Sequence, residues 1–443
     1  MWKRANWSGH LAFVLAASAS AVGLGNIWRF PSQAASHGGG VFLLAYVIFS
    51  VFFGIPLLVT EIALGRKTRR SPSRTFRRLN RKWWFVGALA MIIPVIILPY
   101  YSVIGGWVVK YFISSFFSGT AAIEFDSWRN DIMNVGVCMF AFQLLTFALV
   151  FLGIKQGIEK SNKIMMPALI LLTIAIAVFV VLQPASRAGI RYYMIPDFPR
   201  LSSGGASGAA GLARTLLAAM GQMFFSLSIA MGIMITYGSY VRKDDSIPKA
   251  SARIVFFDTF VALLAGLIII PGAFAFGGAE LAQKGGFQLM FVSLPKIFSS
   301  MAFGRIVEIA FFTLVLFAAL TSSISIAETV TSSLCDFLLI KRRTGAIIVF
   351  LYMFLASIPS ALSLKALGAF DFTADILLMP ICAFLTCFFV GWVIKPDVVL
   401  DEIAESRPHA RKLYTIFIRF IAPILIAVIF VSGLLDSFGI ISL

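Results

Sequence analysis

Two glycines, an amide and a guanidinium stand close together inside the first apolar segment of the chain. They belong to the run Ser-Ala-Val-Gly-Leu-Gly-Asn-Ile-Trp-Arg-Phe-Pro at residues 20–31. Glycine weakens a helix, and irregular backbone at membrane depth is tolerated only where it is buried in protein or lines a polar cavity. The ends of two half-helices offer N–H groups to an anion and carbonyl groups to a cation. The sequence therefore predicts a broken membrane helix with a solute or ion site at the break.

A second interruption occurs in a later apolar segment, in the run Phe-Ser-Leu-Ser-Ile-Ala-Met-Gly at residues 225–232. An interruption that recurs at corresponding positions of two halves is typical of an inverted-topology repeat, whose breaks meet near the membrane midplane. We expect a single transmembrane domain, residues 1–443. Its two repeats would cover about 11–183 and 213–394, with a peripheral helix at about 413–434.

The composition indicates an all-α integral membrane protein. Hydrophobic residues make up 59% of the chain, charged residues 13%, and the mean hydropathy is +0.92. These values exclude an ordinary soluble globular protein. Windows of about 20 apolar residues predict about eleven spans. The predicted spans lie near residues 11–33, 41–64, 85–117, 134–152, 162–183, 213–240, 252–277, 306–338, 346–363, 374–394 and 413–434.

The formal net charge of +17 is carried by short segments between the apolar runs. Residues 66–82, for example, hold nine Lys and Arg and no acid. We interpret these segments as orientation signals and not as a nucleic-acid surface. They predict a multi-pass protein of the inner (plasma) membrane with a cytoplasmic N-terminus and an extracytoplasmic C-terminus. The four cysteines lie in apolar stretches and are expected to be free thiols.

Several longer motifs resemble the neurotransmitter:sodium symporter family. In chain order, they are the run at 21–31, Gly-Gly-Gly-Val-Phe at 38–42, Gly-Ile-Pro-Leu-Leu-Val-Thr-Glu-Ile-Ala-Leu-Gly-Arg at 54–66, Gly-Gln-Met-Phe-Phe-Ser-Leu-Ser at 221–228 and Thr-Tyr-Gly-Ser-Tyr at 236–240. The eleven-span length resembles the prokaryotic amino-acid transporters of this family. The resemblance implies a protein that is not an enzyme and that couples inward sodium flow to solute uptake by alternating access.

The resemblance also implies two sodium sites built from oxygen atoms, which a hard cation prefers. The first would consist of the carbonyl of Ala21 and the side chains of Asn26, Ser226 and Asp258. The second would consist of the carbonyls of Ala19, Val22 and Ala318 and the hydroxyls of Thr321 and Ser322. A single Ser or Thr in a span more often bonds a preceding carbonyl or a neighbouring helix. The adjacent pair in the family's motif favours the ion site.

Asp258 departs from the amide that much of the family has at this position. Chloride-dependent members hold a chloride nearby, whereas a carboxylate supplies the negative charge itself. Because an unpaired buried charge is costly, we expect Asp258 to be either paired with sodium or protonated. This predicts chloride independence, with proton antiport on the return step as a further expectation. The alternative is a carboxylate that only bonds a neighbouring helix.

The position of Gly23 indicates the substrate class. Amine transporters of the family carry an aspartate there, and a glycine leaves room for a substrate that brings its own carboxylate. The resemblance implies a substrate site formed by Ala21, Leu24, Gly25, Ile97, Tyr101, Phe225, Ser226, Ser228, Met231, Ser322 and Ile326. This mostly apolar lining favours a hydrophobic L-amino acid. A transporter-like amino-acid sensor and a symporter of another small zwitterionic solute remain the alternatives.

Two charge pairs match the family's gates, although each could be a static ion pair. The outer gate would consist of Arg29, Asp371 and the lid Phe225, and the inner gate of Arg4, Trp7, Ser239, Tyr240 and Asp336. Gly157 and Pro167 weaken the fifth span, and the resemblance suggests that its unwinding admits water to the second sodium site. Glu61 is expected to accept hydrogen bonds from freed amides of the sixth span.

Other function classes find less support in the residues. An intramembrane hydrolase needs a nucleophile or a metal set, but the chain has three histidines and neither a His-Glu-x-x-His nor a Gly-x-Ser-x-Gly motif. A channel would not need a repeat of broken helices with gates on both sides. The basic start and the following apolar run resemble a cleaved signal peptide, but the apolar pattern continues into the glycine break.

Overall fold

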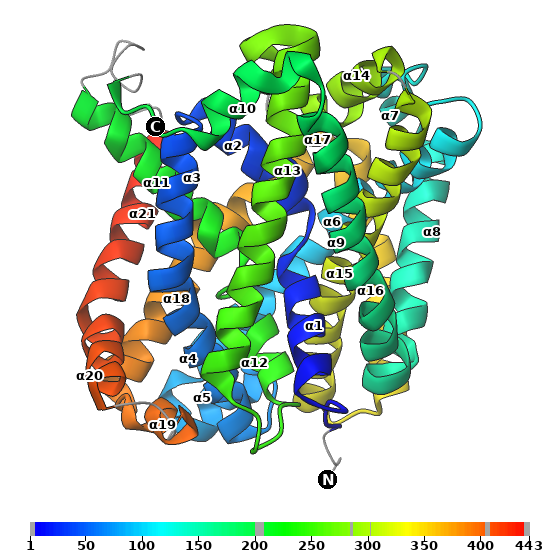
Figure 1. Ribbon diagram of the computed structural model, residues 1–443. Coiled ribbons are helices and arrows are strands. Elements are labelled where there is room, and N and C mark those ends of the chain that lie inside the picture. Colours follow the sequence, from blue (N-terminus) through cyan, green and yellow to red (C-terminus); the bar gives the residue numbers. More distant parts are fainter. Residues whose placement is uncertain (1–4, 200–207, 284–286, 302, 404–407, 438–443) are drawn as a thin grey trace.

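The computed structural model describes residues 5–199, 208–283, 287–301, 303–403 and 408–437. These residues form helices and no strand, and Figure 1 shows the long helices running between two ends of one bundle. Nine described helices are long and apolar enough to cross a membrane, or ten when one bent pair counts as a single span. The predicted all-α membrane fold is confirmed, while the eleventh span stays a prediction.

The helices follow the apolar runs of the sequence. The α-helices are α1 (His10–Ala21), α2 (Phe30–Ser36), α3 (Gly40–Phe49), α4 (Ile55–Thr68), α5 (Pro72–Leu79), α6 (Trp84–Phe116), α7 (Phe125–Asn130), α8 (Ile132–Phe151), α9 (Lys160–Val181), α10 (Arg187–Met194), α11 (Gly208–Ser226), α12 (Ile233–Gly238), α13 (Ile247–Gln283), α14 (Leu294–Ser300), α15 (Gly304–Leu338), α16 (Arg342–Leu362), α17 (Leu364–Asp371), α18 (Met379–Phe388), α19 (Asp397–Leu400), α20 (Pro408–Ile416) and α21 (Ala422–Ser437). Short 3-10 segments are η3 (Arg81–Trp83), η5 (Pro184–Ser186) and η10 (Asp401–Ile403). Wider π-helical turns are η1 (Gly25–Arg29), η2 (Ser50–Gly54), η4 (Ile154–Glu159), η7 (Leu289–Ser293), η8 (Phe372–Leu378), η9 (Phe389–Val393) and η11 (Phe417–Ile421).

The first predicted break lies between α1 and η1. The backbone of Val22 turns extended, with φ −75° and ψ 90°, and stops the helix after Ala21. The chain becomes helical again at η1 and continues into α2, and the two halves are bent by 51°. The glycines of the run are therefore used to interrupt one span, as the sequence predicts.

The second break separates α11 from α12. Residues 227–232 are not helical, and three of them, Ser228, Ala230 and Gly232, have φ angles of +53°, +67° and +69°. This left-handed backbone costs an alanine roughly 1–2 kcal/mol. Ala230 must therefore be held by its surroundings. The sixth predicted span corresponds to this interrupted pair of helices.

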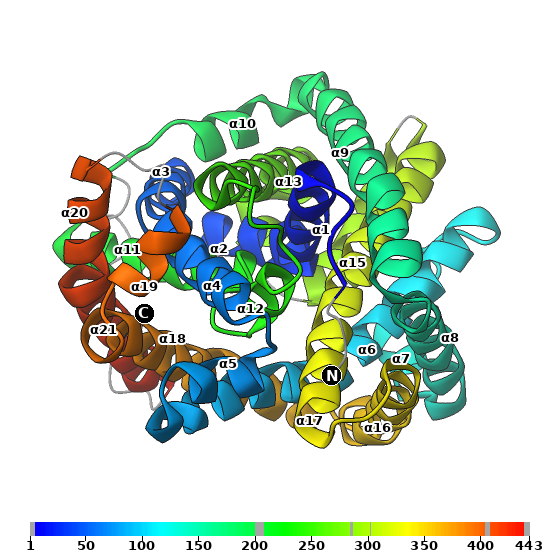
Figure 2. The same ribbon diagram turned by 90° about the horizontal axis from the view of Figure 1, so that it is seen from below.

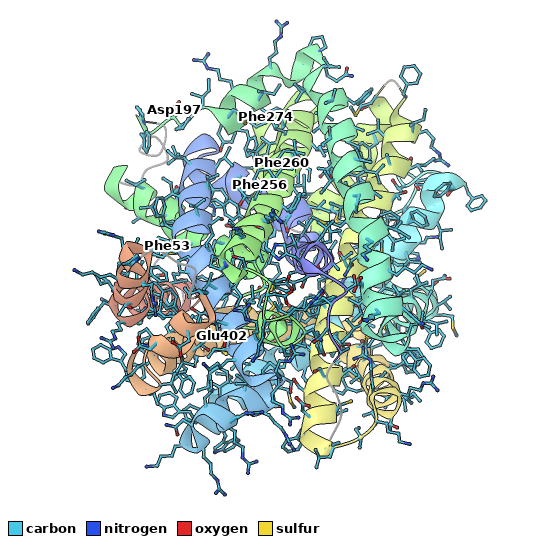
Figure 3. The ribbon with its side chains drawn as sticks, turned by 60° about the horizontal axis from the view of Figure 1, so that its bottom comes forward. Phe53, Asp197, Phe256, Phe260, Phe274 and Glu402 are labelled. Carbon is cyan, nitrogen blue, oxygen red and sulfur yellow. The ribbon has the colours of Figure 1, made fainter. Side chains whose placement is uncertain are left out.

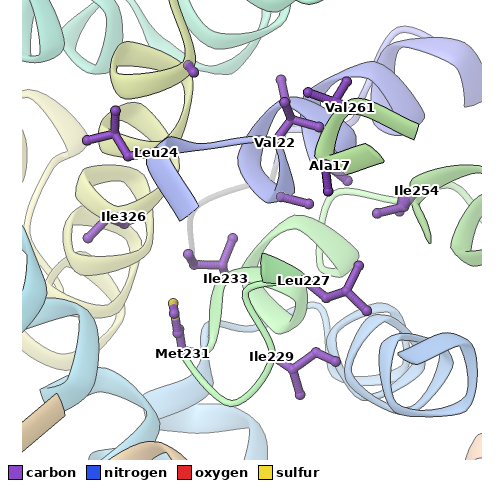
Figure 4. Close-up of a cluster of buried hydrophobic side chains, with 14 of the residues drawn as sticks. Ala17, Val22, Leu24, Leu227, Ile229, Met231, Ile233, Ile254, Val261 and Ile326 are labelled. Atoms are coloured by element: carbon purple, nitrogen blue, oxygen red, sulfur yellow. The ribbon is translucent and has the colours of Figure 1, made fainter. Parts of the chain in front are cut away.

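The two breaks pack together in the middle of the bundle. Figure 4 draws Val22 and Leu24 of the first break and Met231 of the second in one buried cluster, in which Leu24 lies beside Ile326 of α15. All four side chains are at most 4% exposed. The bundle's outer surface is also apolar, since Phe256 of α13, labelled in Figure 3, is 61% exposed. An apolar core with an apolar exterior is the pattern expected in a lipid bilayer.

Short helices and loops, among them α5, α12 and α19, lie at the basic end of the bundle, seen from below in Figure 2. Arg66, at the end of α4, is 6% exposed. Its Nε donates to Glu402 Oε2 at 2.7 Å, and its Nη1 donates to the Asp245 carbonyl at 2.6 Å. Glu402 lies at this end in Figure 3. Arg66 therefore ties η10 and the loop before α13 to α4.

Candidate functional site

Asp258 lies at the centre of a buried polar cluster between the two breaks. Its carboxylate accepts hydrogen bonds from the Asn26 amide at 2.7 Å and from the Ser226 hydroxyl at 2.8 Å. Asn26 belongs to η1, and Ser226 is the last residue of α11. The three side chains are at most 2% exposed. The structure thus brings together the three side chains proposed for the first sodium site.

Tyr46 of α3 completes this cluster, and sequence reasoning did not find it. Its hydroxyl donates to Asp258 Oδ2 at 2.7 Å and lies 3.1 Å from Ser226 Oγ. A single tyrosine among the apolar residues of a predicted span was the available signal. Nowhere in the described ranges do three or more His, Cys, Asp or Glu side chains gather as for a metal. Hydroxyl, amide and carbonyl oxygens around one carboxylate suit a monovalent hard cation.

The residues expected at the second sodium site come from α1 and α15. Ala19 lies in the last turn of α1 and Val22 caps it, where carbonyl groups lack helical partners. The Ser322 hydroxyl donates to the neighbouring Ser20 carbonyl at 3.2 Å. The Thr321 hydroxyl donates within its own helix to the Ala318 carbonyl at 3.0 Å. The two elements therefore touch at the expected place.

The glycines of the first break leave little space for any side chain. A Cβ atom at Gly23 would lie 2.4 Å from Ser322 Oγ and 3.6 Å from the Tyr101 hydroxyl oxygen. A Cβ atom at Gly25 would lie 2.6 Å from the ring of Phe225. The Tyr101 hydroxyl is buried without a hydrogen-bond partner among the described residues. A polar ligand at the break would satisfy it.

The other residues expected to contact substrate lie on the helices around this space. Ser228 is 7% exposed, and its hydroxyl donates to the Ser20 carbonyl at 3.3 Å. Ile97 of α6, Met231 of the second break and Ile326 of α15 are all at most 4% exposed. Ala21 and Leu24 flank the first break. Buried apolar side chains and the hydroxyl groups of Ser228 and Ser322 thus lie around the first break.

Glu61 of α4 holds the second break in its strained conformation. Its Oε1 accepts a hydrogen bond from the Ala230 backbone N–H at 2.7 Å. Glu61 is 3% exposed, and its Oε2 has no partner among the described residues. The contact fixes the residue whose φ is +67°. This is the kind of contact expected for Glu61 from the sequence.

The outer ion pair differs from the prediction. Arg29 Nη1 bonds Asp375 Oδ2 at 2.6 Å, and its guanidinium lies 4.4 Å from the ring centre of Phe225. Asp371, the predicted acidic partner, forms no salt bridge with Arg29 in the described part of the chain, and its gate role stays a prediction. Asp371 ends α17 and Asp375 follows in η8, so both lie on one face of a continuing helix. The more buried acid takes the cation, since a buried carboxylate needs a partner.

At the basic end, Trp7 seals the start of α1 against α12. Its ring N–H donates to the Tyr237 carbonyl at 3.1 Å, and its backbone N–H donates to the Tyr240 carbonyl at 3.1 Å. The Ser239 hydroxyl donates to the carbonyl of Thr236, in the same short helix, at 2.6 Å. These contacts join the segment before α1 to α12 and the residues that follow it.

Asp336, the acid expected in the inner gate, contacts the turn between α4 and α5. Its Oδ2 accepts from the Ser71 N–H at 2.8 Å and from the Ser71 hydroxyl at 2.7 Å. Arg70 Nη1 lies 3.8 Å from Asp336 Oδ1. Arg4, its expected partner, lies outside the described residues.

A second buried acid at this end has a role that the sequence did not reveal. Glu328 of α15 is 0% exposed and forms a salt bridge with both terminal nitrogens of Arg342, the first residue of α16. The Tyr240 hydroxyl donates to Glu328 Oε1 at 2.8 Å. Tyr240 therefore joins α12 to this pair. In the sequence, only the position of Arg342 in a basic segment before a predicted span pointed to it as the partner of Glu328.

The start of the fifth span is wound in this structure. Gly157 lies within the π-helical turn η4, and a Cβ atom there would lie 1.8 Å from the Leu149 carbonyl oxygen. Glu159 accepts hydrogen bonds from the Ser8 N–H at 3.0 Å and from Lys163 at 2.7 Å. Pro167 lies inside α9. The irregular turn thus ends at Glu159 and α-helix follows from Lys160, and the unwinding of this stretch stays a prediction.

Comparison with known proteins agrees with the motifs. The profile of the family described as "Sodium:neurotransmitter symporter family" matches residues 4–143 and 119–438. YhdH of Bacillus subtilis (strain 168), an uncharacterized sodium-dependent transporter, is 33% identical over 97% of this chain and 98% of its own length. MJ1319 of Methanocaldococcus jannaschii, also an uncharacterized sodium-dependent transporter, is 31% identical over 93% of this chain and 85% of its own.

A solved structure is similar over the whole fold. The crystal structure of MhsT in complex with L-phenylalanine superposes with a TM-score of 0.87 at 34% identity, covering 97% of this chain and 100% of MhsT. The resemblance inferred from the motifs is confirmed. The chain belongs to the sodium:neurotransmitter symporter family and is a sodium-dependent membrane transporter, not an enzyme.

Proposed function

We propose that this protein imports a hydrophobic L-amino acid together with sodium by alternating access. The observation that carries the proposal is the Asp258 cluster, where η1, the end of α11 and α13 meet at one buried carboxylate. Sodium at this point would neutralise the carboxylate and lie beside the break that offers N–H groups to a substrate carboxylate. The similar MhsT structure holds L-phenylalanine, which supports a hydrophobic amino acid as substrate.

The two sodium ions would occupy the sites described above. Asp258, Asn26 and Ser226 would hold the first ion with the Ala21 carbonyl. The α1 and α15 oxygens would hold the second. Because Asp258 supplies a negative charge, transport would not require chloride. On the return step a proton on Asp258 would take the place of the sodium, since an unpaired carboxylate in this buried cluster is costly.

The gates would open in turn. On one side, Arg29, Asp375 and Phe225 cover the substrate space. On the other, Trp7 closes the start of α1 and the Glu328–Arg342 pair holds α12 through Tyr240. We propose that the basic end faces the cytoplasm, as the positive-inside rule predicts. In Figure 1, α1 begins at the lower face of the bundle and α21 runs to the upper face, which fits an odd number of crossings.

Uptake into proteoliposomes tests the proposal. Labelled phenylalanine, leucine and tryptophan are offered with and without an inward sodium gradient, and chloride is replaced by gluconate. We expect sodium-driven, chloride-independent uptake in the wild type and weak or chloride-sensitive uptake in Asp258→Asn. Asp126→Asn makes the same change on the exposed face of α7 and serves as the matched control. Accumulation that ignores sodium would refute the ion sites, and saturable binding without accumulation would indicate a sensor.

A further inference from the structure

A hollow lined only by arginines lies beside α5, at the basic end of the bundle. Its volume is about 350 Å³, and its lining consists of Arg70, Arg74, Arg77 and Arg78. We call it the arginine hollow. Arg70 lies 3.8 Å from Asp336, but no described acid lies within ion-pair distance of the other three. Four neighbouring guanidinium groups with one acidic partner leave a strongly positive surface that attracts anions.

The arginine hollow lies where a membrane surface is expected. The Phe76 ring is 0% exposed and packs 5.1 Å from that of Phe389, whereas Arg77 and Arg78 on the same short helix are exposed. The next span begins with three aromatic residues, and Trp84 among them is 57% exposed. Exposed tryptophan at the start of a span marks the headgroup level of a bilayer. Figure 2 shows α5 at the edge of the bundle, where lipid can reach it.

We propose that the arginine hollow binds the phosphate headgroup of an anionic phospholipid. Guanidinium groups bind phosphate oxygens in pairs of parallel hydrogen bonds, and several arginines beside a membrane span attract anionic lipid. The volume accommodates a phosphate group. Lipid is the favoured source because the hollow lies beside the aromatic start of the α6 span.

The arginine hollow is connected to the closed basic end by a very short turn. Arg70 lines the hollow and faces Asp336, while the next residue, Ser71, donates two hydrogen bonds to the same carboxylate. Pro72 follows and packs against the second break, where a Cβ atom at Gly232 would lie 2.5 Å from its Cγ. A bound phosphate competes with Asp336 for Arg70. The lipid would therefore loosen the contact between this turn and Asp336 of α15, the acid of the inner gate, a consequence that rests on the proposed function.

Native mass spectrometry of the purified full-length protein tests the binding itself. Phosphatidylglycerol and phosphatidylcholine are titrated onto the wild type and onto Arg74→Gln/Arg77→Gln. Each surface arginine contributes roughly fivefold to anionic-lipid affinity, so we expect about 30-fold weaker phosphatidylglycerol binding in this variant. Arg411→Gln/Lys412→Gln on α20 removes the same charge at the same end of the bundle and should change the affinity little.

The outcomes separate the sources of phosphate. The proposal would be overturned if both double variants lost the same affinity for phosphatidylglycerol, or if the wild type bound phosphatidylglycerol and phosphatidylcholine equally well. Glycerol phosphate and inorganic phosphate are added as competitors, and displacement of the lipid at equal concentration would mean a soluble anion site instead. Thermal unfolding of each variant verifies that the comparison concerns folded protein.

Uptake measured in the two lipids tests the link to the inner gate. We expect phosphatidylglycerol to raise the uptake rate by up to about fivefold, the effect of one arginine contact, and Arg70→Gln to abolish this dependence. Lipid binding without sodium-driven uptake would contradict the proposed function and leave the lipid site standing. Sodium-driven uptake without selective lipid binding would contradict the lipid site and leave the proposed function standing.

Discussion

Gly25 is the position where a single added methyl group should impair substrate binding most directly. A Cβ atom there would lie 2.6 Å from Phe225 Cε1 and 2.8 Å from Cδ1, whereas ordinary contact begins at 3.4 Å. The ring must therefore retreat by about 0.8 Å, the difference between 3.4 and 2.6 Å. Arg29 lies over the same ring at 4.4 Å from its centre, so the displacement also disturbs the outer gate.

The expected cost follows from this overlap. Overpacking a buried site costs roughly 1–3 kcal/mol. If the cost falls on the closed, substrate-bound state, Gly25→Ala should weaken binding by about 5- to 150-fold. The measurement is equilibrium binding of labelled phenylalanine to purified protein at saturating sodium. A Phe225→Leu change in the same background should recover part of the loss, because the smaller side chain makes room.

Gly221→Ala is the matched control. Gly221 lies on α11, one turn before Phe225, and a Cβ atom there meets nothing within 4 Å. We expect wild-type affinity for this variant, together with unchanged thermal stability or a slight gain, since alanine is the better helix former. If the two alanine variants bind phenylalanine equally well, the lid role of Phe225 and the placement of substrate beside Gly25 are both refuted.

Three further outcomes test individual contacts. Glu328→Gln should lower the free energy of unfolding by roughly 1–3 kcal/mol, because it removes the charge that pairs with Arg342, whose side chain is 25% exposed. Thermal unfolding should show this loss, and an unchanged midpoint would contradict it. Asp375→Asn should accelerate substrate dissociation through the outer gate more than Asp371→Asn does, as measured by release of labelled amino acid, and the reverse order would restore the original assignment. Ala230→Gly should stabilise the protein by about 1 kcal/mol, since glycine tolerates the left-handed backbone, and a loss of stability would refute the strain argument.

The broken helices were predictable because their causes are local. Glycines and polar residues inside an apolar run disfavour a continuous helix wherever the run packs. The break at Ser228, Ala230 and Gly232 was located in the same way. The left-handed conformation of Ala230 was not predictable, because an alanine adopts it only when a distant group such as Glu61 holds the backbone.

The residues of the site likewise divide into those that local sequence identified and those that only distant contacts revealed. Asn26 and Ser226 were identified because they stand within recognisable motifs, and Asp258 was carried over from the family's pattern in the seventh span. Tyr46 and Arg342 were missed, since each gains its role from a contact with a residue far along the chain. In the sequence, Tyr46 fits ordinary packing within an apolar span, and Arg342 fits an ordinary basic loop.

The amino-acid sequence by itself determined the membrane-spanning helical class, the two breaks, the family and the acid at position 258. Hydropathy and backbone propensity are local quantities, so they can be read along one dimension. The tertiary structure decided which partners meet, and it paired Arg29 with Asp375 and not with Asp371. Two acids on one helix face are equivalent in the sequence, and only the tertiary structure places one of them within reach of the guanidinium.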